Sequence, residues 1–161
     1  MSGTQQFFAL GSIIILSLVM LQFNSSVLES STVDLENKVY LTAFSLADDL
    51  IEEIKQKAFD ANTINFPTTD PTDLTSAYAL GKGWWEVYPN FNDIDDFNYY
   101  VRSVSAPHAE KYKVSCRVYY VDPDDPDRVV WTQTFYKKVV ISVSSPYMRK
   151  SIDLSFVFTL K

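Results

Sequence analysis

The sequence predicts an α+β protein in which a long N-terminal helix packs, by its second half, on a C-terminal antiparallel sheet of about four strands. From Gln5 to about Phe59 apolar residues recur at helical spacing, and after Phe97 they alternate with polar residues. The 161 residues are 47% hydrophobic, enough for one folded domain beyond the helix. We therefore expect a hydrophobic helix half (1–28), an amphipathic helix half (29–60), and a connecting region followed by a β-domain (61–161).

The first half of the predicted helix is apolar on all sides. The run from Phe7 to Phe23 is about 17 residues, at the short end of the lengths that span a bilayer. A secretory signal has basic residues ahead of its apolar run, whereas none precedes this one. The helical pattern also continues beyond the run. We therefore expect it to be covered by lipid or by copies of itself. The residues expected to make this contact are Phe7, Phe8, Leu10, Gly11, Ile13, Ile14, Ile15, Leu16, Leu18, Val19, Met20, Leu21 and Phe23.

The second half of the helix carries an apolar stripe opposite an acidic face. Its members recur at steps of three and four, which places them on one side of a helix. They are Val33, Tyr40, Leu41, Phe44, Ala47, Leu50, Ile51, Ile54, Ala58 and Phe59. We expect this stripe to pack on the sheet that follows, because the sheet also has one apolar face to cover.

The remaining sequence predicts a connecting region and then strands. Residues 60–90 lack periodicity and carry several prolines and glycines. We expect Trp84 and Trp85, with Tyr78 and Tyr88, to pin this region by packing on the domain or on a neighbouring subunit. Strands are predicted at residues 97–102, 113–120, about 129–144 and 152–160. The single cysteine, Cys116, lies in such an alternation and is expected to be a small buried hydrophobe.

Residue types that carry catalysis are sparse, and we predict a protein without enzymatic activity. The only histidine, His108, is expected in a turn, and no glycine-rich phosphate loop, Ser-His-Asp set or zinc spacing is present. The net charge of −6 argues against nucleic acid as a partner.

Two acidic clusters offer the oxygen ligands that calcium prefers. One is Asp93, Asp95 and Asp96, and the other lies within residues 122–127; neither has EF-hand spacing. We interpret both as solvated turns, with calcium at Asp93, Asp95 and Asp96 as the alternative. No other cofactor is expected.

Taken together, these segments resemble the type IV pilin superfamily, which includes pilins, minor pilins and the pseudopilins of type II secretion. The resemblance covers the whole chain. It rests on the N-terminal apolar helix and on the segments Ser45–Ile54, Ala58-Phe59-Asp60, Asp93–Phe97 and Lys138–Val143.

The resemblance implies a subunit that assembly machinery inserts in the cytoplasmic membrane and then extracts into an extracellular helical filament. The N-terminal helices would bundle at the filament core, so the main partner is the chain itself. The alternatives are a minor pilin or pseudopilin of a type II secretion-like system, and a single-pass membrane-tethered β-domain that binds a partner without polymerising.

The N-terminus departs from the pattern of this superfamily. Its members usually have a short basic leader ending in glycine, then phenylalanine, and a glutamate at the fifth mature position. Here the corresponding leader is the uncharged Met1-Ser2-Gly3, which makes Gly3 the candidate processing site. No acid precedes Glu29, so Gln5 or Gln6 would supply a neutral hydrogen bond in place of the ion pair of the superfamily.

Overall fold

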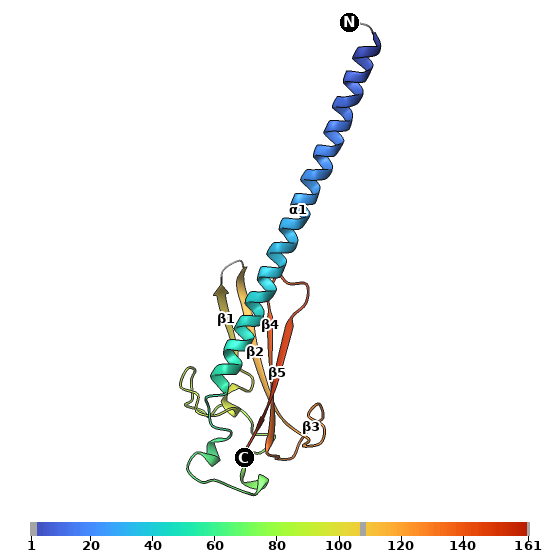
Figure 1. Cartoon of the computed structure of the whole chain (residues 1–161). Helices are drawn as coiled ribbons and strands as arrows, with labels where there is room; N and C mark the ends of the chain where they lie inside the picture. Colours follow the sequence, from blue (N-terminus) through green and yellow to red (C-terminus); the bar gives the residue numbers. More distant parts are fainter. Residues whose placement is uncertain (1–2, 107–108, 161) are drawn as a thin grey trace. The chain divides into compact units, whose positions relative to one another are not determined.

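The structure is a computed structural model that describes residues 3–106 and 109–160; His108 lies outside them. One long helix, α1 (Gly3–Ile54), is followed by three short 3-10 helices, η1 (Ala61–Thr63), η2 (Pro71–Asp73) and η3 (Asp95–Phe97) (Figure 1). The strands are β1 (Val101–Ala106), β2 (Ala109–Val121), β3 (Val129–Val130), β4 (Tyr136–Ser144) and β5 (Ile152–Thr159). The predicted α+β class, a long helix with an antiparallel sheet, is confirmed.

The chain divides into two units, the first ending at Lys38 and the second running from Val39 to Lys161. The described part of the first unit is α1 alone, and none of its side chains is buried. The second unit holds the end of α1, the connecting region and the sheet, and therefore contains the hydrophobic core.

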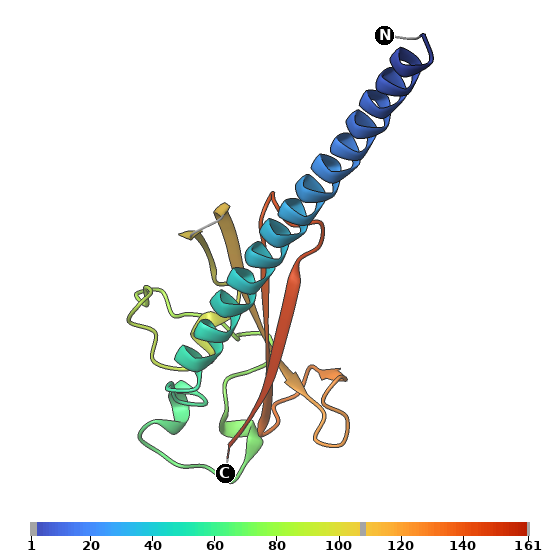
Figure 2. The same ribbon diagram turned by 45° about the horizontal axis from the view of Figure 1, so that its top comes forward.

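The sheet of the second unit is antiparallel, with strand order β1-β2-β4-β5 and β3 paired to the end of β2. The central pair is β2 with β4, in a register that sets Cys116 opposite Ile141 and Tyr120 opposite Lys137. The last turns of α1 lie across one face of this sheet (Figures 1 and 2). Alternate residues of β4 are buried, as predicted for Val139, Ile141 and Val143.

The face of α1 that packs on the sheet differs in part from the predicted stripe. The buried residues of α1 are Val39, Ala43, Ala47, Leu50, Ile51 and Ile54. The sequence pattern also puts Val33, Leu41 and Phe44 on this face, but all three are exposed. The contact face begins with Val39, Ala43 and Ala47, which recur at steps of four and so lie on one side of the helix. The small side chains of Ala43 and Ala47 let the helix backbone approach the sheet.

The predicted end of the helix, near Phe59, is wrong. The backbone N–H of Ala58 donates to the Asn92 carbonyl (3.1 Å), and the N–H of Ile94 donates to the Ala58 carbonyl (3.0 Å). This pairing replaces the helical hydrogen bonds beyond the last turn of α1. It also places Phe59 and Asp60 in the interior of the second unit.

Two strand predictions also need correction. Residues 97–100 precede β1 rather than belonging to it, because the side-chain amide of Asn98 bonds the Leu80 carbonyl (2.9 Å) and the Val118 N–H (3.1 Å) and fixes an irregular backbone there. The single strand predicted over residues 129–144 is divided into β3 and β4. Between them the Thr134 hydroxyl donates to the Val121 carbonyl (2.9 Å) and holds a turn.

Because the core lies within the second unit, a fragment of residues 29–161 is expected to be a soluble, folded monomer. Its stripe and sheet cover each other without help from residues 1–28. Analytical ultracentrifugation and near-UV circular dichroism would test this, with the detergent-solubilised full chain as the control. An insoluble fragment, or one without a near-UV signal, would show that folding requires the first 28 residues or neighbouring subunits.

Candidate functional site

The apolar segment predicted to mediate assembly lies entirely on α1 in the first unit. Its large side chains are all exposed, from Leu18 at 56% to Phe8 at 80%. By length and composition this part of α1 is compatible with a membrane span, a signal sequence or a helix buried in a larger core. The described residues of this chain provide no cover for it.

Two serines within this segment satisfy their hydroxyl groups without water. Ser12 Oγ donates to the Ala9 carbonyl and Ser17 Oγ to the Ile13 carbonyl, both at 2.8 Å. Hydroxyls bonded back to their own helix can be buried in lipid or against another helix at little cost. Gly11 directly precedes Ser12, and a Cβ atom built on it would meet nothing within 4 Å.

The three polar positions singled out at the N-terminus are also on α1. Gly3 is its first residue, and Gln5 and Gln6 follow with exposed side chains. Their proposed roles, processing after Gly3 and a hydrogen bond from Gln5 or Gln6, stay predictions.

The second unit contains a buried charge cluster, which we define as Asp60, Asp93, Asp95 and Lys137. The Lys137 side chain on β4 is 0% exposed. Its Nζ donates to the Phe59 carbonyl (2.8 Å) and to Asp60 Oδ2 (2.9 Å), and lies 2.6 Å from Asp95 Oδ1. Nζ also lies 4.5 Å from the centre of the Phe59 ring, which favours the cation.

Asp60 is the fully satisfied carboxylate of this cluster. Besides Lys137, it accepts hydrogen bonds from Asn62 N–H (3.1 Å) and from the Thr75 N–H (2.9 Å) and hydroxyl (3.0 Å). Burial acts to raise the pKa of Asp60, but the Lys137 ammonium and these donors outweigh burial and hold the pKa below its ordinary value. Asp60 is therefore the ionised partner of Lys137.

Asp95 and Asp93 are in the opposite electrostatic situation. No described group other than Lys137 donates to Asp95, and burial, reinforced by the charges of Asp93 and Asp60, raises its pKa to about 7 against the pull of Lys137. Burial also raises the pKa of Asp93, although backbone hydrogen bonds from Ala61 and from the Asp96 N–H (3.1 Å to Oδ1) act to lower this pKa. One ammonium thus faces three carboxyl groups that lie within 4.8 Å of one another.

The expectation that Asp93, Asp95 and Asp96 form a solvated turn is wrong, since each is at most 3% exposed. Asp96 does not join the cluster; its carboxylate accepts the Asn92 N–H (2.9 Å), and burial raises its pKa to about 6. We do not assign the three clustered carboxylates as metal ligands, because the Lys137 ammonium already contacts two of them where a cation would bind. The second acidic turn is exposed, and Asp122 there pairs with Arg128.

Sequence reasoning missed Lys137, although a signal was present. Lys137 is in phase with Val139, Ile141 and Val143, so the alternation of β4 directs it to the core face. On β2, Tyr120 is opposite Lys137 and is in phase with the buried Cys116. Burial raises the pKa of the Cys116 thiol to about 12, in agreement with the predicted buried hydrophobe.

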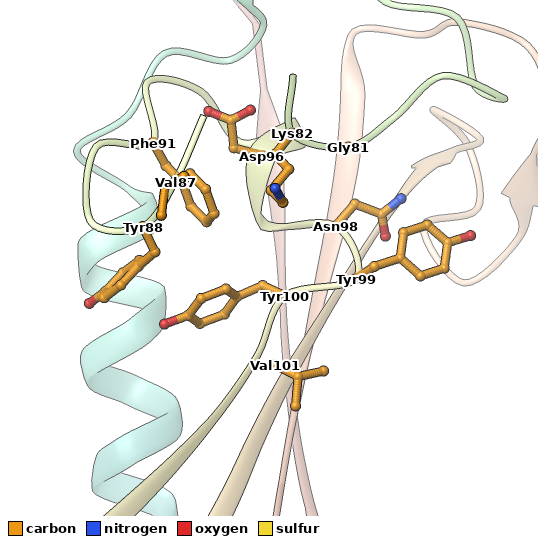
Figure 3. Close-up of a pocket in the computed structure, with 10 residues that line it drawn as sticks. All are labelled: Gly81, Lys82, Val87, Tyr88, Phe91, Asp96, Asn98, Tyr99, Tyr100 and Val101. Atoms are coloured by element: carbon orange, nitrogen blue, oxygen red, sulfur yellow. The ribbon is translucent and has the colours of Figure 1, made fainter. Parts of the chain in front are cut away.

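A pocket of about 480 Å³ lies beside the cluster, in the connecting region ahead of β1 (Figure 3). Tyr88, Phe91 and Tyr100 form its aromatic wall. Its polar side chains already have structural partners: Asn98 bonds Leu80 and Val118, and Lys82 donates to the Glu86 carbonyl (3.3 Å). The described residues that line the pocket do not bring an acid, a base and a nucleophile together in one hydrogen-bonded set.

The expectation that Trp84 and Trp85 pin the connecting region to the domain is wrong. Their side chains are 92% and 85% exposed. Tyr88, which is expected to pin this region together with them, does so, since its hydroxyl donates to Glu53 on α1 (3.1 Å) and accepts from Arg102 on β1 (3.1 Å). Packing of the two tryptophans against a neighbouring subunit stays a prediction.

Replacing Lys137 by methionine is expected to destabilise the second unit by about 3–5 kcal/mol, because it leaves buried carboxylates without their cation. Urea unfolding followed by near-UV circular dichroism would measure this. Lys138→Met is the matched control, since Lys138 pairs with an Asp127 side chain that is 91% exposed and its removal should change stability little. Equal unfolding midpoints for the two variants would contradict a structural role for Lys137.

Comparison of the chain with family models, curated proteins and solved structures finds no match.

Proposed function

We propose that this chain is a structural subunit of an extracellular helical filament of the type IV pilin class, assembled through residues 5–28. The observation that supports it most is the exposure of the whole apolar segment in a protein whose second unit already encloses its own core. The resemblance of the sequence to pilins supports the same reading.

The apolar segment requires a cover that the described residues do not supply. Exposed apolar surface of this extent drives association in water. Lipid would provide a cover before assembly, and parallel copies of the same helix would provide one afterwards. Leu41 and Phe44, on the part of α1 that belongs to the second unit, are also exposed and would need a cover other than lipid.

Assembly through identical contacts has a geometric consequence. If each subunit binds the next through the same pair of surfaces without closing a ring, the result is an open helical polymer. A minor pilin or pseudopilin would use the same contacts at the tip or in a shorter polymer. In either case the subunit resides in the cytoplasmic membrane first and reaches the cell surface on assembly.

The competing proposal is a single-pass membrane tether for a β-domain, which the length and composition of α1 favour. The two proposals differ in what they require of residues 5–28. Lipid accepts any sufficiently hydrophobic helix, whereas helices packed against one another depend on the size of each side chain, with small residues where backbones approach.

Replacing Gly11 and Ser12 by leucine is therefore expected to abolish or strongly reduce filament formation. The isolated chain has room for a side chain at Gly11, so loss of assembly would report on contacts between subunits. Filaments sheared from the cell surface would be quantified by sedimentation and immunoblotting in the native host. Met20→Leu, which conserves volume, is the control, and membrane extraction would confirm that each variant is inserted.

Filament yield equal to that of the wild type, with both leucines present, would contradict a packed helical core and favour the membrane tether.

A further inference from the structure

The contact between Lys137 and Asp95 has the features of a reactive pair rather than of an ordinary ion pair. Lys137 Nζ lies 2.6 Å from Asp95 Oδ1, and among the described residues no other group donates a hydrogen bond to either oxygen of Asp95. The side chains are 0% and 3% exposed, so water does not solvate either group. An ion pair this deeply buried, whose carboxylate has no donor other than the ammonium, is costly to bury.

The carboxylate of Asp60 provides the comparison within the same cluster. It binds the same ammonium, but hydrogen bonds from Thr75 and Asn62 stabilise its charge. A carboxylate stabilised in this way is a poor electrophile. Asp95 has no such donors, so its neutral, more electrophilic form is favoured by its surroundings.

We propose that Lys137 and Asp95 condense into an intramolecular amide bond, between Nζ of Lys137 and Cγ of Asp95, with release of one water molecule. This is a self-catalysed modification within the second unit. It goes beyond the proposed filament function and does not depend on it.

The reaction balances with the groups present. A proton moves from the ammonium to Asp95, which gives a neutral amine and a neutral carboxylic acid. The amine nitrogen attacks Cγ and the N–C bond forms. The nitrogen then releases one proton to Asp60, whose Oδ2 already accepts a hydrogen bond from Nζ at 2.9 Å. Asp60 passes that proton to the hydroxyl of Asp95 as its C–O bond breaks, and water leaves. No oxidant, cofactor or activated group is consumed.

Two features of the surroundings favour the reaction, although the Phe59 ring and Asp60 favour the ammonium form of Lys137. The pKa of Asp95, raised to about 7 by burial, populates the neutral acid at neutral pH. Asp93 contributes as a positioning residue, because its charge adds to this rise. Fixed orientation of the two reactants replaces a bimolecular encounter, and exclusion of water limits hydrolysis of the product.

The next lysine of β4, Lys138, forms an ion pair at the surface that lacks these properties. Lys138 Nζ lies 2.5 Å from Asp127 Oδ1, the same two residue types at a similar distance, but Asp127 is 91% exposed. Water stabilises both charges there, so no condensation is expected. This pair is an internal negative control in every experiment.

The amide would join the segment just before β1 to β4 across the core. Asp95 lies in η3 and Lys137 near the start of β4, so the bond would prevent the connecting region from separating from the sheet. A subunit that carries load along a polymer would then extend less before it unfolds.

Peptide mass spectrometry of the purified, folded full chain would test the proposal. We expect the peptides that carry residues 95 and 137 to be joined, with a mass lower by one water molecule than their sum, and Lys137 to resist trypsin. Lys137→Arg should abolish the joined peptide. Asp95→Ala should abolish it as well, because no carboxyl carbon remains for Nζ of Lys137 to attack.

Unmodified peptides from folded wild-type protein, after prolonged incubation at neutral pH, would overturn the proposal. A link from Lys137 to Asp60 or Asp93 would overturn the assignment of Asp95. Joining of Lys138 to Asp127 would show that proximity alone, without burial, is sufficient and would contradict the mechanism. Since the readout is a covalent bond, none of these outcomes depends on whether the chain forms filaments.

Discussion

The burial of one ammonium among three carboxyl groups is the constraint on which the second unit depends. Lys137 reaches from β4 to the Phe59 carbonyl and Asp60 just after α1 and to Asp95 in η3. It therefore connects the end of the helix, the connecting region and the sheet at a single point. This explains why α1 ends at Ile54: the chain must leave the helix to bring Asp60 to the cation. Ala43, Ala47 and Leu50 of α1 contribute apolar contacts to the core that they share with the sheet. The charge cluster determines how the connecting segments approach the sheet.

The two units differ in how far their apolar side chains are covered. The second unit encloses a hydrophobic core and has partners for nearly all of the buried polar groups among its described residues. The described part of the first unit satisfies its backbone and serine hydroxyls within the helix but leaves its apolar side chains uncovered. A chain built in this way can exchange the cover of α1, from lipid to other helices, without refolding the rest. The proposed function, extraction from a membrane into a polymer, would require this separation.

The sequence was sufficient to predict the class, the long helix and the inward face of β4, because these follow from periodicity. It did not predict the end of α1 or the start of β1, because tertiary hydrogen bonds from Ala58 and Asn98 override local pattern there. The buried cluster escaped prediction because aspartates near a turn are usually solvated. Here Asp60 and Asp95 contact one lysine from a distant strand, and Asp93 lies within 4.8 Å of both carboxylates. Lys137 alone could have been recognised, as a charge in phase with Val139 and Ile141.

The central claim is that residues 5–28 are buried between copies of the same helix. Electron cryo-microscopy of the native protein, purified without detergent, tests it most directly. The account predicts helical fibres in which these residues lie along the axis and contact the same segment of neighbouring subunits. Discrete particles, or monomers found only in micelles or membrane under every condition of purification, would contradict it.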